Sequence, residues 1–193
     1  MPDLCRGLDG CQRRTRPCFS QHLSQKWGVP RKPIHCMVAI APDGAIGAAG
    51  RLAWDIPEDT RQFLALTEGG VMIEGPLCYA ELGKALPKRG TVVVSRDPAK
   101  SVPGASRAAT LPAAISLAQA MPWPGPIWIT GGERIYTEGL PWCDRLYITR
   151  VGLPIVGDRF FPRDWEASFP RLLGQRRSRQ GAIDLSFEVR GRA

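Results

Sequence analysis

Short apolar runs alternate with amphipathic segments along most of this chain, and the two kinds of segment predict strands and helices in turn. The runs at 36–41 and 91–95 are continuous, and the second is rich in β-branched residues, which is typical of buried strands, whereas 185–190 alternates like a strand with one face in water. Strands are expected at 36–41, 71–73, 91–95, 127–130, 143–151 and 185–190. Helices are expected at 57–66, 77–82 and 111–120, with a further helical turn through Tyr136. In the first of these helices, Phe63, Leu64 and Leu66 supply the predicted apolar face.

Strands that alternate with short helices predict an α/β fold with a mainly parallel sheet. The last segments follow one another without a helix between them, so the C-terminal end is expected to be an antiparallel strand hairpin. We therefore predict a single domain over residues 34–193, with a central, mainly parallel sheet flanked by helices.

The first 33 residues differ from the rest of the chain in both pattern and charge. They show no helical or strand period and end in the breaker-rich segment 28–33, where we place the domain boundary. Seven Lys and Arg residues against Asp3 and Asp9 give this segment a net charge of +5, out of +8 for the whole chain. A basic, flexible extension is the prediction for residues 1–33. An overlong reading of the gene start and an Arg-rich transit segment are alternatives, and the two Asp count against the second.

A basic extension also raises the possibility of a nucleic-acid partner. No aromatic residues alternate with the basic ones, as a single-strand binding surface requires, so none is expected. No apolar run is long enough to cross a bilayer, and the N-terminus lacks the apolar core of a secretory signal. A cytoplasmic protein without a membrane partner is therefore expected. Six cysteines without a CxxC pair and two distant histidines predict no metal site.

Three segments carry candidate chemistry, and the first is 52–63. Pro57 suits a first helical turn, and Asp55 with Glu58 three residues later resembles a capping box. Capping alone accounts for Glu58 and Asp59, but it leaves Trp54 and Phe63 unexplained. A carboxylate between an indole and a phenyl ring suits a flat, amidine-like heterocycle, because it pairs with two N–H donors while the rings pack on the ligand.

The second segment is 129–134, where Gly131 and Gly132 lie between a strand and a helix. Paired glycines at that place let the backbone approach a ligand closely, although a plain tight turn is the more common explanation. The third feature is the set Arg89, Arg96 and Arg134, which follow strands or turns. At the carboxyl edge of a parallel sheet such residues meet anionic ligands, and elsewhere they are surface charges.

From about residue 34 to its end, the chain resembles the dihydrofolate reductases. The resemblance rests on AIG (45–47), LAW with PED (52–59), LPKRGTVVVSR (86–96), ITGGERIY (129–136), LYITRV (146–151) and GDRFFP (157–162), in that order. It implies an NADPH-dependent reduction of dihydrofolate to tetrahydrofolate, with hydride transfer to C6 of the pterin and protonation at N5. It also implies a monomer whose partners are small molecules.

The resemblance implies roles at the substrate. Asp59 would bind the 2-amino-4-oxo edge of the pterin and favour N5 protonation, Thr149 would hydrogen-bond that carboxylate, and Trp54 would belong to the mobile catalytic loop. Arg89 would pair with the α-carboxylate of the substrate's glutamate. The remaining implied substrate contacts are Met37, Ala39, Phe63, Leu82, Leu86, Thr130 and Tyr136.

The resemblance also implies a cofactor site for NADPH. Ile46 and Gly47 would belong to the loop over the nicotinamide, Gly131 and Gly132 would be joined by a cis peptide, and Arg96 and Arg134 would contact phosphates. The remaining implied cofactor contacts are Ala39, Gly75, Cys78, Ser95, Thr130, Glu133, Ile135 and Tyr136.

One stretch departs from the family's pattern. The family shows a Met-Gly-Arg-x-Thr run after its second main strand, whereas this chain has Glu74, Gly75, Pro76, Leu77 and Cys78. The missing Arg and Thr are phosphate-side residues, and a Glu near phosphate repels it. Cofactor affinity and the preference for NADPH over NADH stay open here, and Arg96 and Arg134 favour NADPH. We also hypothesise an unusual response to antifolates such as trimethoprim, which an inhibition constant would test.

Two other functions stay open. A pyrimidine reductase of the riboflavin-synthesis type would share the fold, but Asp59 after the Trp-Asp-Ile-Pro loop favours a pterin substrate. A non-catalytic pterin-binding protein would bind ligand without turnover, and the altered stretch 74–78 is the reason to consider it.

Overall fold

The computed structural model describes residues 31–193, so most of the predicted extension 1–33 lies outside the described residues. The last part of that segment is described and contacts the domain. The Lys32 ammonium donates hydrogen bonds to the carbonyl oxygens of Ala118 (2.9 Å) and Met121 (2.6 Å). The Lys32 backbone N–H donates to Gln119 Oε1 at 3.0 Å. These bonds satisfy carbonyl groups at the C-terminal end of a helix, where a cation is favourable.

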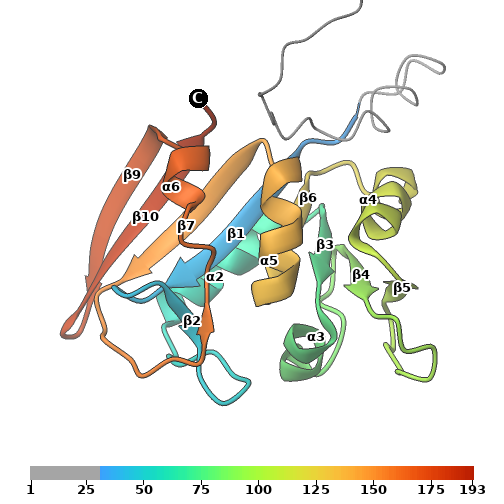
Figure 1. Cartoon of the computed structure of the whole chain (residues 1–193), viewed down its shortest axis with the longest axis horizontal. Coiled ribbons are helices and arrows are strands. Elements are labelled where there is room, and N and C mark those ends of the chain that lie inside the picture. Colours follow the sequence, from blue (N-terminus) through green and yellow to red (C-terminus); the bar gives the residue numbers. More distant parts are fainter. Residues whose placement is uncertain (1–30) are drawn as a thin grey trace, which may run out of the picture. The chain divides into compact units, whose positions relative to one another are not determined.

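A sheet of eight strands forms the centre of the described residues, in the order β5-β4-β3-β6-β1-β7-β10-β9 (Figure 1). Its strands are β1 (Ile34–Ile40), β3 (Val71–Glu74), β4 (Gly90–Val94), β5 (Ser106–Ala108), β6 (Ile127–Gly131), β7 (Arg145–Val151), β9 (Arg171–Gln180) and β10 (Ile183–Gly191). The first six of these pair in parallel, and β10 runs antiparallel to both β7 and β9. The predicted mainly parallel sheet with an antiparallel C-terminal hairpin is thus confirmed. A second, two-stranded sheet joins β2 (Ala45–Gly47) to β8 (Arg159–Phe160).

Helices cover both faces of the sheet. They are α2 (Pro57–Thr67), α3 (Pro76–Leu82), α4 (Leu111–Ala120), α5 (Glu133–Gly139) and α6 (Trp165–Ser168), with a 3₁₀ turn at Leu140–Trp142. In Figure 1, α4 and α5 lie in front of the sheet and α2 lies behind it. The main apolar cluster lies between the front helices and one side of the strands, with Leu111 and Ile135 from the helices packed among strand residues such as Ile73 and Ile129. The opposite side of β1, β6 and β7 faces the site described below.

The start of α2 differs from the prediction. The residue that precedes the helix is Ile56 rather than Asp55, and its side chain makes no capping hydrogen bond. Glu58 is held elsewhere: its carboxylate pairs with the Arg176 guanidinium, and Ser178 Oγ donates to its Oε2 at 2.7 Å. These contacts join α2 to β9, and they lower the pKa of Glu58, chiefly through the Arg176 hydrogen bond. The predicted capping box is therefore wrong, because a strand distant in sequence supplies the partners of Glu58.

The apolar face predicted for α2 is also partly wrong. Leu64 and Leu66 are exposed, and Thr67 is the one buried residue that the helix contains. Phe63 is half-buried and lies in the cleft described below. Of the three residues predicted to form the apolar face, only Phe63 faces the cleft, so the sequence period of this helix is a poor guide to its burial.

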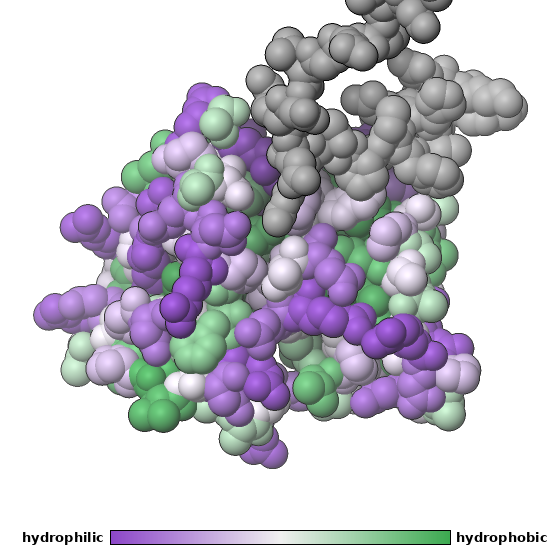
Figure 2. All heavy atoms as spheres, in the orientation of Figure 1, coloured by the Kyte–Doolittle hydropathy of each residue, from purple (hydrophilic) through white to green (hydrophobic). Residues whose placement is uncertain are grey.

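The polar strand β9 was absent from the predicted elements. All but two of its residues are exposed, and it forms one edge of the sheet, where Figure 2 shows hydrophilic side chains gathered. The Arg176 guanidinium lies 4.1 Å from the centre of the Phe187 ring on β10, a cation–π contact. Charged edge strands resist pairing with other chains, and they carry no apolar alternation that a sequence pattern could reveal.

Candidate active site

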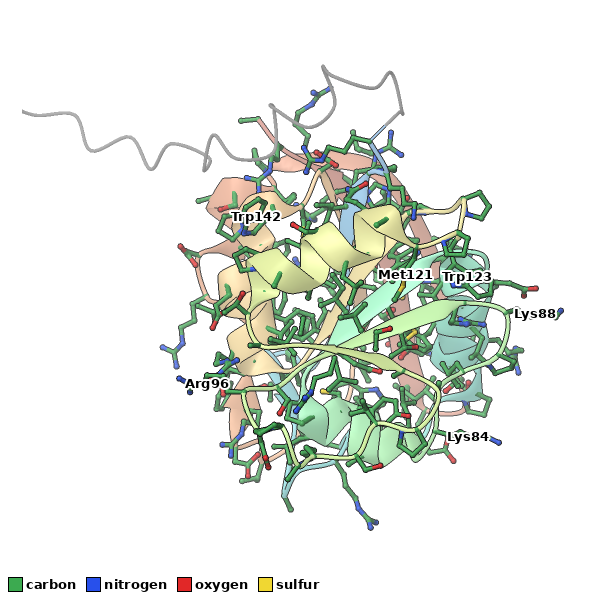
Figure 3. All side chains as sticks on the ribbon, turned by 90° about the vertical axis from the view of Figure 1, so that its right-hand side faces the viewer. Lys84, Lys88, Arg96, Met121, Trp123 and Trp142 are labelled. Carbon is green, nitrogen blue, oxygen red and sulfur yellow. The ribbon has the colours of Figure 1, made fainter. Side chains whose placement is uncertain are left out.

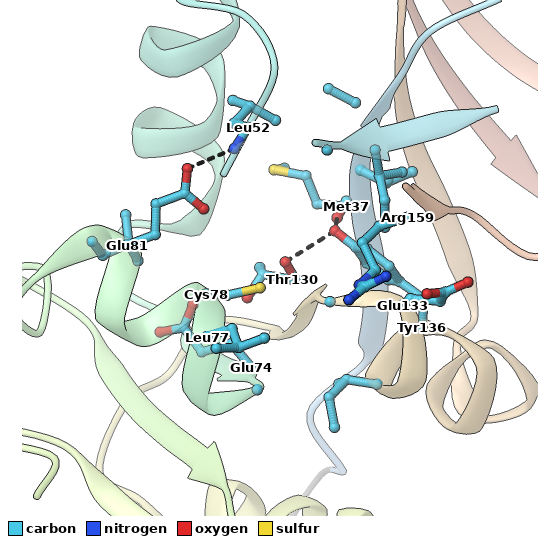
Figure 4. A pocket seen from close by; sticks show the side chains of 18 of the residues that line it. Met37, Leu52, Glu74, Leu77, Cys78, Glu81, Thr130, Glu133, Tyr136 and Arg159 are labelled. Carbon is cyan, nitrogen blue, oxygen red and sulfur yellow. Dashed lines mark hydrogen bonds between the residues drawn. The ribbon is translucent and has the colours of Figure 1, made fainter. Parts of the chain in front are cut away.

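A cleft of about 750 Å³ opens where β1 and β6 end and where α2 and α3 begin. Its position outside the carboxyl ends of parallel strands is the usual ligand position in open α/β sheets. Side chains from the strands form its floor, and the segment 46–52 and helices α2, α3 and α5 form its walls. Figure 4 shows Glu74, Leu77 and Cys78 on one side of this cleft and Glu133, Tyr136 and Arg159 on the other.

Asp59 lies in the first turn of α2 and points into the cleft with Phe63 one turn later. Burial raises the pKa of the Asp59 carboxyl, and a side-chain hydrogen bond with Thr149 acts in the opposite direction. Thr149 belongs to β7 and is buried itself, so it holds the carboxyl in place from the sheet. The result is a partly buried acid beside an aromatic ring, which is suited to a flat heterocycle that carries N–H donors.

The Tyr136 hydroxyl joins two strands at the back of the cleft. It lies 2.9 Å from the carbonyl oxygen of Met37 on β1 and 2.9 Å from that of Thr130 on β6, and its single proton goes to one of them at a time. Gly131 and Gly132 follow Thr130 and are joined by a cis peptide, as predicted. A side chain at Gly131 would bring its Cβ within 3.0 Å of the Tyr136 ring, and the φ of +114° there also requires glycine. Gly132, which has no side chain, therefore presents its backbone to the cleft.

Basic side chains lie around the end of the cleft that α5 and β4 form. Arg96, Arg134 and Arg159 all line it, and Arg134 also pairs with Glu138 one helical turn on (3.3 Å). Lys88 and Arg96 lie at opposite ends of β4 (Figure 3), and of these two only Arg96, at the carboxyl end, lines the cleft. Three guanidinium groups beside a glycine-rich backbone turn suit a ligand with phosphate groups.

Glu74 is the unexpected group at this end of the cleft. It is only 2% exposed, and its Oε1 has no hydrogen-bond partner among residues 31–193. Burial alone raises the pKa of Glu74 to about 7. The neighbouring Cys78 thiol is similarly affected: burial, with Glu74 and Glu81 adding to it, raises its pKa to about 12. The thiol is therefore neutral and weakly nucleophilic, because the thiolate is the reactive form.

The segment 46–52 is held to the rest of the cleft by backbone hydrogen bonds to two carboxylates. The Leu52 N–H donates to Glu81 Oε1 on α3 at 2.7 Å (Figure 4), and the Ala49 N–H donates to Asp158 Oδ2 at 3.2 Å. The segment is thereby held at its middle and at its C-terminal end, and it forms one wall of the site.

Comparison with known proteins decides the family. The dihydrofolate reductase family model matches residues 33–190. The chain is 36% identical over 133 residues to dihydrofolate reductase type 3 of Salmonella typhimurium. That alignment covers 67% of this chain and 78% of the relative. It is 29% identical over 155 residues to dihydrofolate reductase of Bacillus subtilis strain 168, which covers 80% of this chain and 90% of the relative. The chain belongs to the dihydrofolate reductase family.

The fold agrees with this assignment. Dihydrofolate reductase from Enterococcus faecalis, solved in complex with NADP(H) and RAB-propyl, superposes with a TM-score of 0.76 and 24% sequence identity. The match covers 83% of this chain and 96% of the E. faecalis chain. This likeness shows a dihydrofolate reductase fold over nearly the whole domain.

Most of the residues expected to form the dihydrofolate reductase site line this one cleft. They are Met37, Ala39, Ile46, Gly47, Asp59, Phe63, Gly75, Cys78, Leu82, Ser95, Arg96, Thr130, Gly132, Glu133, Arg134, Ile135, Tyr136 and Thr149. Four others do not line it: Trp54, Leu86, Arg89 and Gly131. Trp54 is buried in a second apolar cluster with Ile56 and Phe187, and Leu86 is half-buried just before β4.

Arg89 is buried and directed toward the protein. Its guanidinium donates to the carbonyl oxygens of Pro87 (3.1 Å) and Leu64 (3.0 Å) and to Thr67 Oγ1. Burial lowers its pKa, with Glu68 acting in the opposite direction. Arg89 therefore fastens the end of α2 to the segment before β4, whatever further contact it makes.

Other cleft residues were not among the contacts expected from the sequence, although Glu74, Pro76 and Leu77 had been singled out as a departure from the family's pattern. They are Val38, Ala48, Gly50, Arg51, Leu52, Thr60, Gln62, Glu74, Pro76, Leu77, Glu81, Val94, Tyr147 and Arg159. Many of them adjoin a predicted residue in the chain, and that adjacency was the available signal. Arg159 comes instead from the short β8, whose two residues carry no period that marks a strand.

Across the part of the chain that the structure describes, no helix is long and apolar enough to cross a membrane. Among the same residues, no three His, Cys, Asp or Glu side chains gather as metal ligands.

Proposed function

We propose that this chain reduces 7,8-dihydrofolate to 5,6,7,8-tetrahydrofolate with NADPH as the hydride donor, and that it acts as a cytoplasmic monomer. The observation that carries the proposal is the Asp59 carboxyl, held by Thr149 and flanked by Phe63 within one cleft. Family membership supports the same reaction, because the relatives are named dihydrofolate reductases.

The substrate end of the cleft suits a pterin. The carboxylate of Asp59 accepts two N–H groups from a 2-amino-pterin edge, while Phe63 packs on the ring. Burial raises the pKa of Asp59, so this carboxyl keeps its proton to a higher pH than an exposed aspartate does. Asp59 thereby favours protonation at N5, and the apolar wall around it excludes water.

The cofactor end suits a dinucleotide phosphate. Backbone at Gly132 leaves room for close approach, since a Cβ there would already lie 3.4 Å from Cys78 Sγ. Arg96 and Arg134 would hold phosphate groups, and Ile46 and Gly47 would lie over the nicotinamide. NADPH, when bound, supplies the hydride, and the chain aligns the two rings and keeps the cleft dry.

The test is NADPH consumption by the purified protein on addition of dihydrofolate, beside an Asp59→Asn variant. A general acid contributes about a hundredfold or more to a rate, so kcat in the variant should fall by at least about that factor. NADPH binding by the variant, measured by fluorescence, controls for folding, because Asp59 is not among the expected cofactor contacts. Turnover that survives in Asp59→Asn would contradict the assignment, and turnover of a ribosylated pyrimidine in place of dihydrofolate would indicate the other reductase.

A further inference from the structure

The Glu74 carboxyl is buried, and an ionised group costs free energy in a buried position. It ends β3 on the side of the sheet that faces the cleft, and it is 2% exposed. Its Oε1 is enclosed by protein atoms and has no hydrogen-bond partner within residues 31–193. A buried polar group of this kind costs free energy unless a partner satisfies it. Glu74 lines the cleft, and rotation about its terminal torsion presents either carboxyl oxygen to that space, so a ligand in the cleft can supply a partner.

The groups around Glu74 do not stabilise its charge. From α3 the neutral Cys78 interacts electrostatically with Glu74, and the acidic Glu81 of the same helix interacts with Cys78. From α5 it faces the Tyr136 phenol, whose pKa burial raises well above its ordinary value and which interacts with Glu74 and with Asp59 of α2. The Cys78 thiol and the Tyr136 phenol are therefore neutral, and the other two groups, Glu81 and Asp59, are acidic.

The basic residues of the cleft are separate from this carboxyl. The charged or titratable residues that share the cleft from the remaining elements are Arg51, Arg96, Glu133, Arg134, Tyr147 and Arg159. None of the ion pairs found among residues 31–193 includes Glu74. Burial is accordingly the single cause that raises the pKa of Glu74 to about 7.

We propose that Glu74 meets the bound dinucleotide as a neutral carboxylic acid and donates a hydrogen bond to one of its phosphate or ribose oxygens, so that binding takes up one proton from solvent. This inference rests on the proposed function. The protonated carboxyl is a donor, which suits an acceptor-rich ligand, whereas the carboxylate has only lone pairs and repels phosphate. Glu74 pairs with Gly131 across β3 and β6, so it lies beside the glycine turn at the cofactor end of the cleft and does not oppose the ligand while it holds its proton.

The consequence is a proton-linked affinity. Below about pH 7 the carboxyl already carries its proton and the affinity is independent of pH. Above that value the ionised group must be reprotonated when the ligand binds, so the dissociation constant rises by about tenfold per pH unit. The proton is taken from solvent, and it returns to solvent when the ligand leaves.

Calorimetric titration of NADP⁺ into the full chain tests this between pH 6 and pH 8.5, in buffers of different ionisation enthalpy. The ligand's own 2′-phosphate also titrates in this range, so the quantity of interest is the difference between wild type and Glu74→Gln. We expect the wild type to take up close to one proton more than the variant at pH 8.5, and its dissociation constant to rise with pH relative to that of the variant. Glu68→Gln, an exposed acid paired with Lys88 at 3.1 Å, should keep the wild-type dependence.

The outcomes separate this inference from the proposed function. Equal proton uptake by the wild type and Glu74→Gln, with NADP⁺ still bound by both, overturns the role of Glu74 and leaves the reductase intact. Failure of the wild type to bind NADP⁺ at any pH removes both. If Glu74→Gln does not fold, infrared difference spectra of the wild type replace it. A protonated-carboxyl band at pH 8.5 that is present in the NADP⁺ complex and absent from the free protein supports the proposal, and its absence from the complex overturns it.

Discussion

The protonation of Glu74 also makes a prediction about folding without any ligand. In the folded chain its pKa is about 7 because the carboxyl is buried, compared with an ordinary value of 4.5 when the chain is unfolded. An acid with a raised pKa binds its proton more tightly in the folded state. Folding stability is therefore unaffected below pH 4.5, falls as the pH rises from 4.5 to 7, and is constant above that.

The size of the effect follows from the two pKa values. One pKa unit corresponds to 1.36 kcal/mol, so the difference between 4.5 and about 7 corresponds to about 3 kcal/mol. The group is 2% exposed, so little solvent screening reduces this figure. Replacement of Glu74 by Gln removes the titration and keeps the shape. The free energy of unfolding of Glu74→Gln, measured relative to wild type, should therefore rise by about 3 kcal/mol between pH 4.5 and pH 8.

Urea unfolding at a series of pH values, followed by tryptophan fluorescence, measures this difference directly. Glu58→Gln is a control of opposite sign, because the Arg176 and Ser178 contacts lower the pKa of Glu58. The stability that those contacts contribute is present above the ordinary pKa and is lost as the pH falls, so Glu58→Gln should be less stable than wild type at neutral pH and equal to it in acid. A difference between Glu74→Gln and wild type that stays constant across this pH range would refute the argument that burial sets the protonation of Glu74.

Two further predictions concern the substrate side of the cleft. Thr149→Val removes the hydrogen bond that lowers the pKa of Asp59, so the acid-limb pKa in a kcat/KM profile should move upward; an unchanged profile would contradict this contact. Tyr136→Phe removes the hydroxyl that lies 2.9 Å from the carbonyl oxygens of Met37 and Thr130, and it should cost about 1 kcal/mol in urea unfolding. Unaltered stability would mean that these carbonyl groups find other donors.

The sequence period predicted the elements that surround the site better than those at the edges. The strand expected at 71–73 is β3, and the helix expected at 111–120 is α4, because both bury continuous apolar surface. Strand β9 lies at an exposed edge, and its arginines show no alternation. The predicted cap at Asp55 failed for a related reason: Glu58 is held by Arg176, a partner more than a hundred residues away that local sequence rules do not include.

In the site, too, short motifs predicted some residues, whereas the contacts of others depend on segments that are distant in the sequence. Asp59, Phe63 and the pair Gly131–Gly132 were predicted from short motifs, and the structure brings Asp59, Phe63 and Gly132 into one cleft. Arg89 was expected to face the substrate, yet its guanidinium N–H groups donate to the carbonyl oxygens of Leu64 and Pro87. A motif locates an arginine in the sequence. It does not predict which carbonyl groups accept its hydrogen bonds, because these depend on the packing of α2 beside β4.

Glu74 shows why residue type alone does not determine the effect of a substitution at a phosphate site. The expectation that a glutamate there repels phosphate holds for a carboxylate, and an exposed side chain on β3 would be one at neutral pH. Burial raises the pKa of Glu74 to about 7, and no arginine within residues 31–193 pairs with it to lower that value. The same side chain is then a donor on the acid side of neutrality and a repelling charge on the alkaline side. Whether the altered stretch 74–78 weakens cofactor binding is therefore a question with a different answer at pH 6 and at pH 8.5.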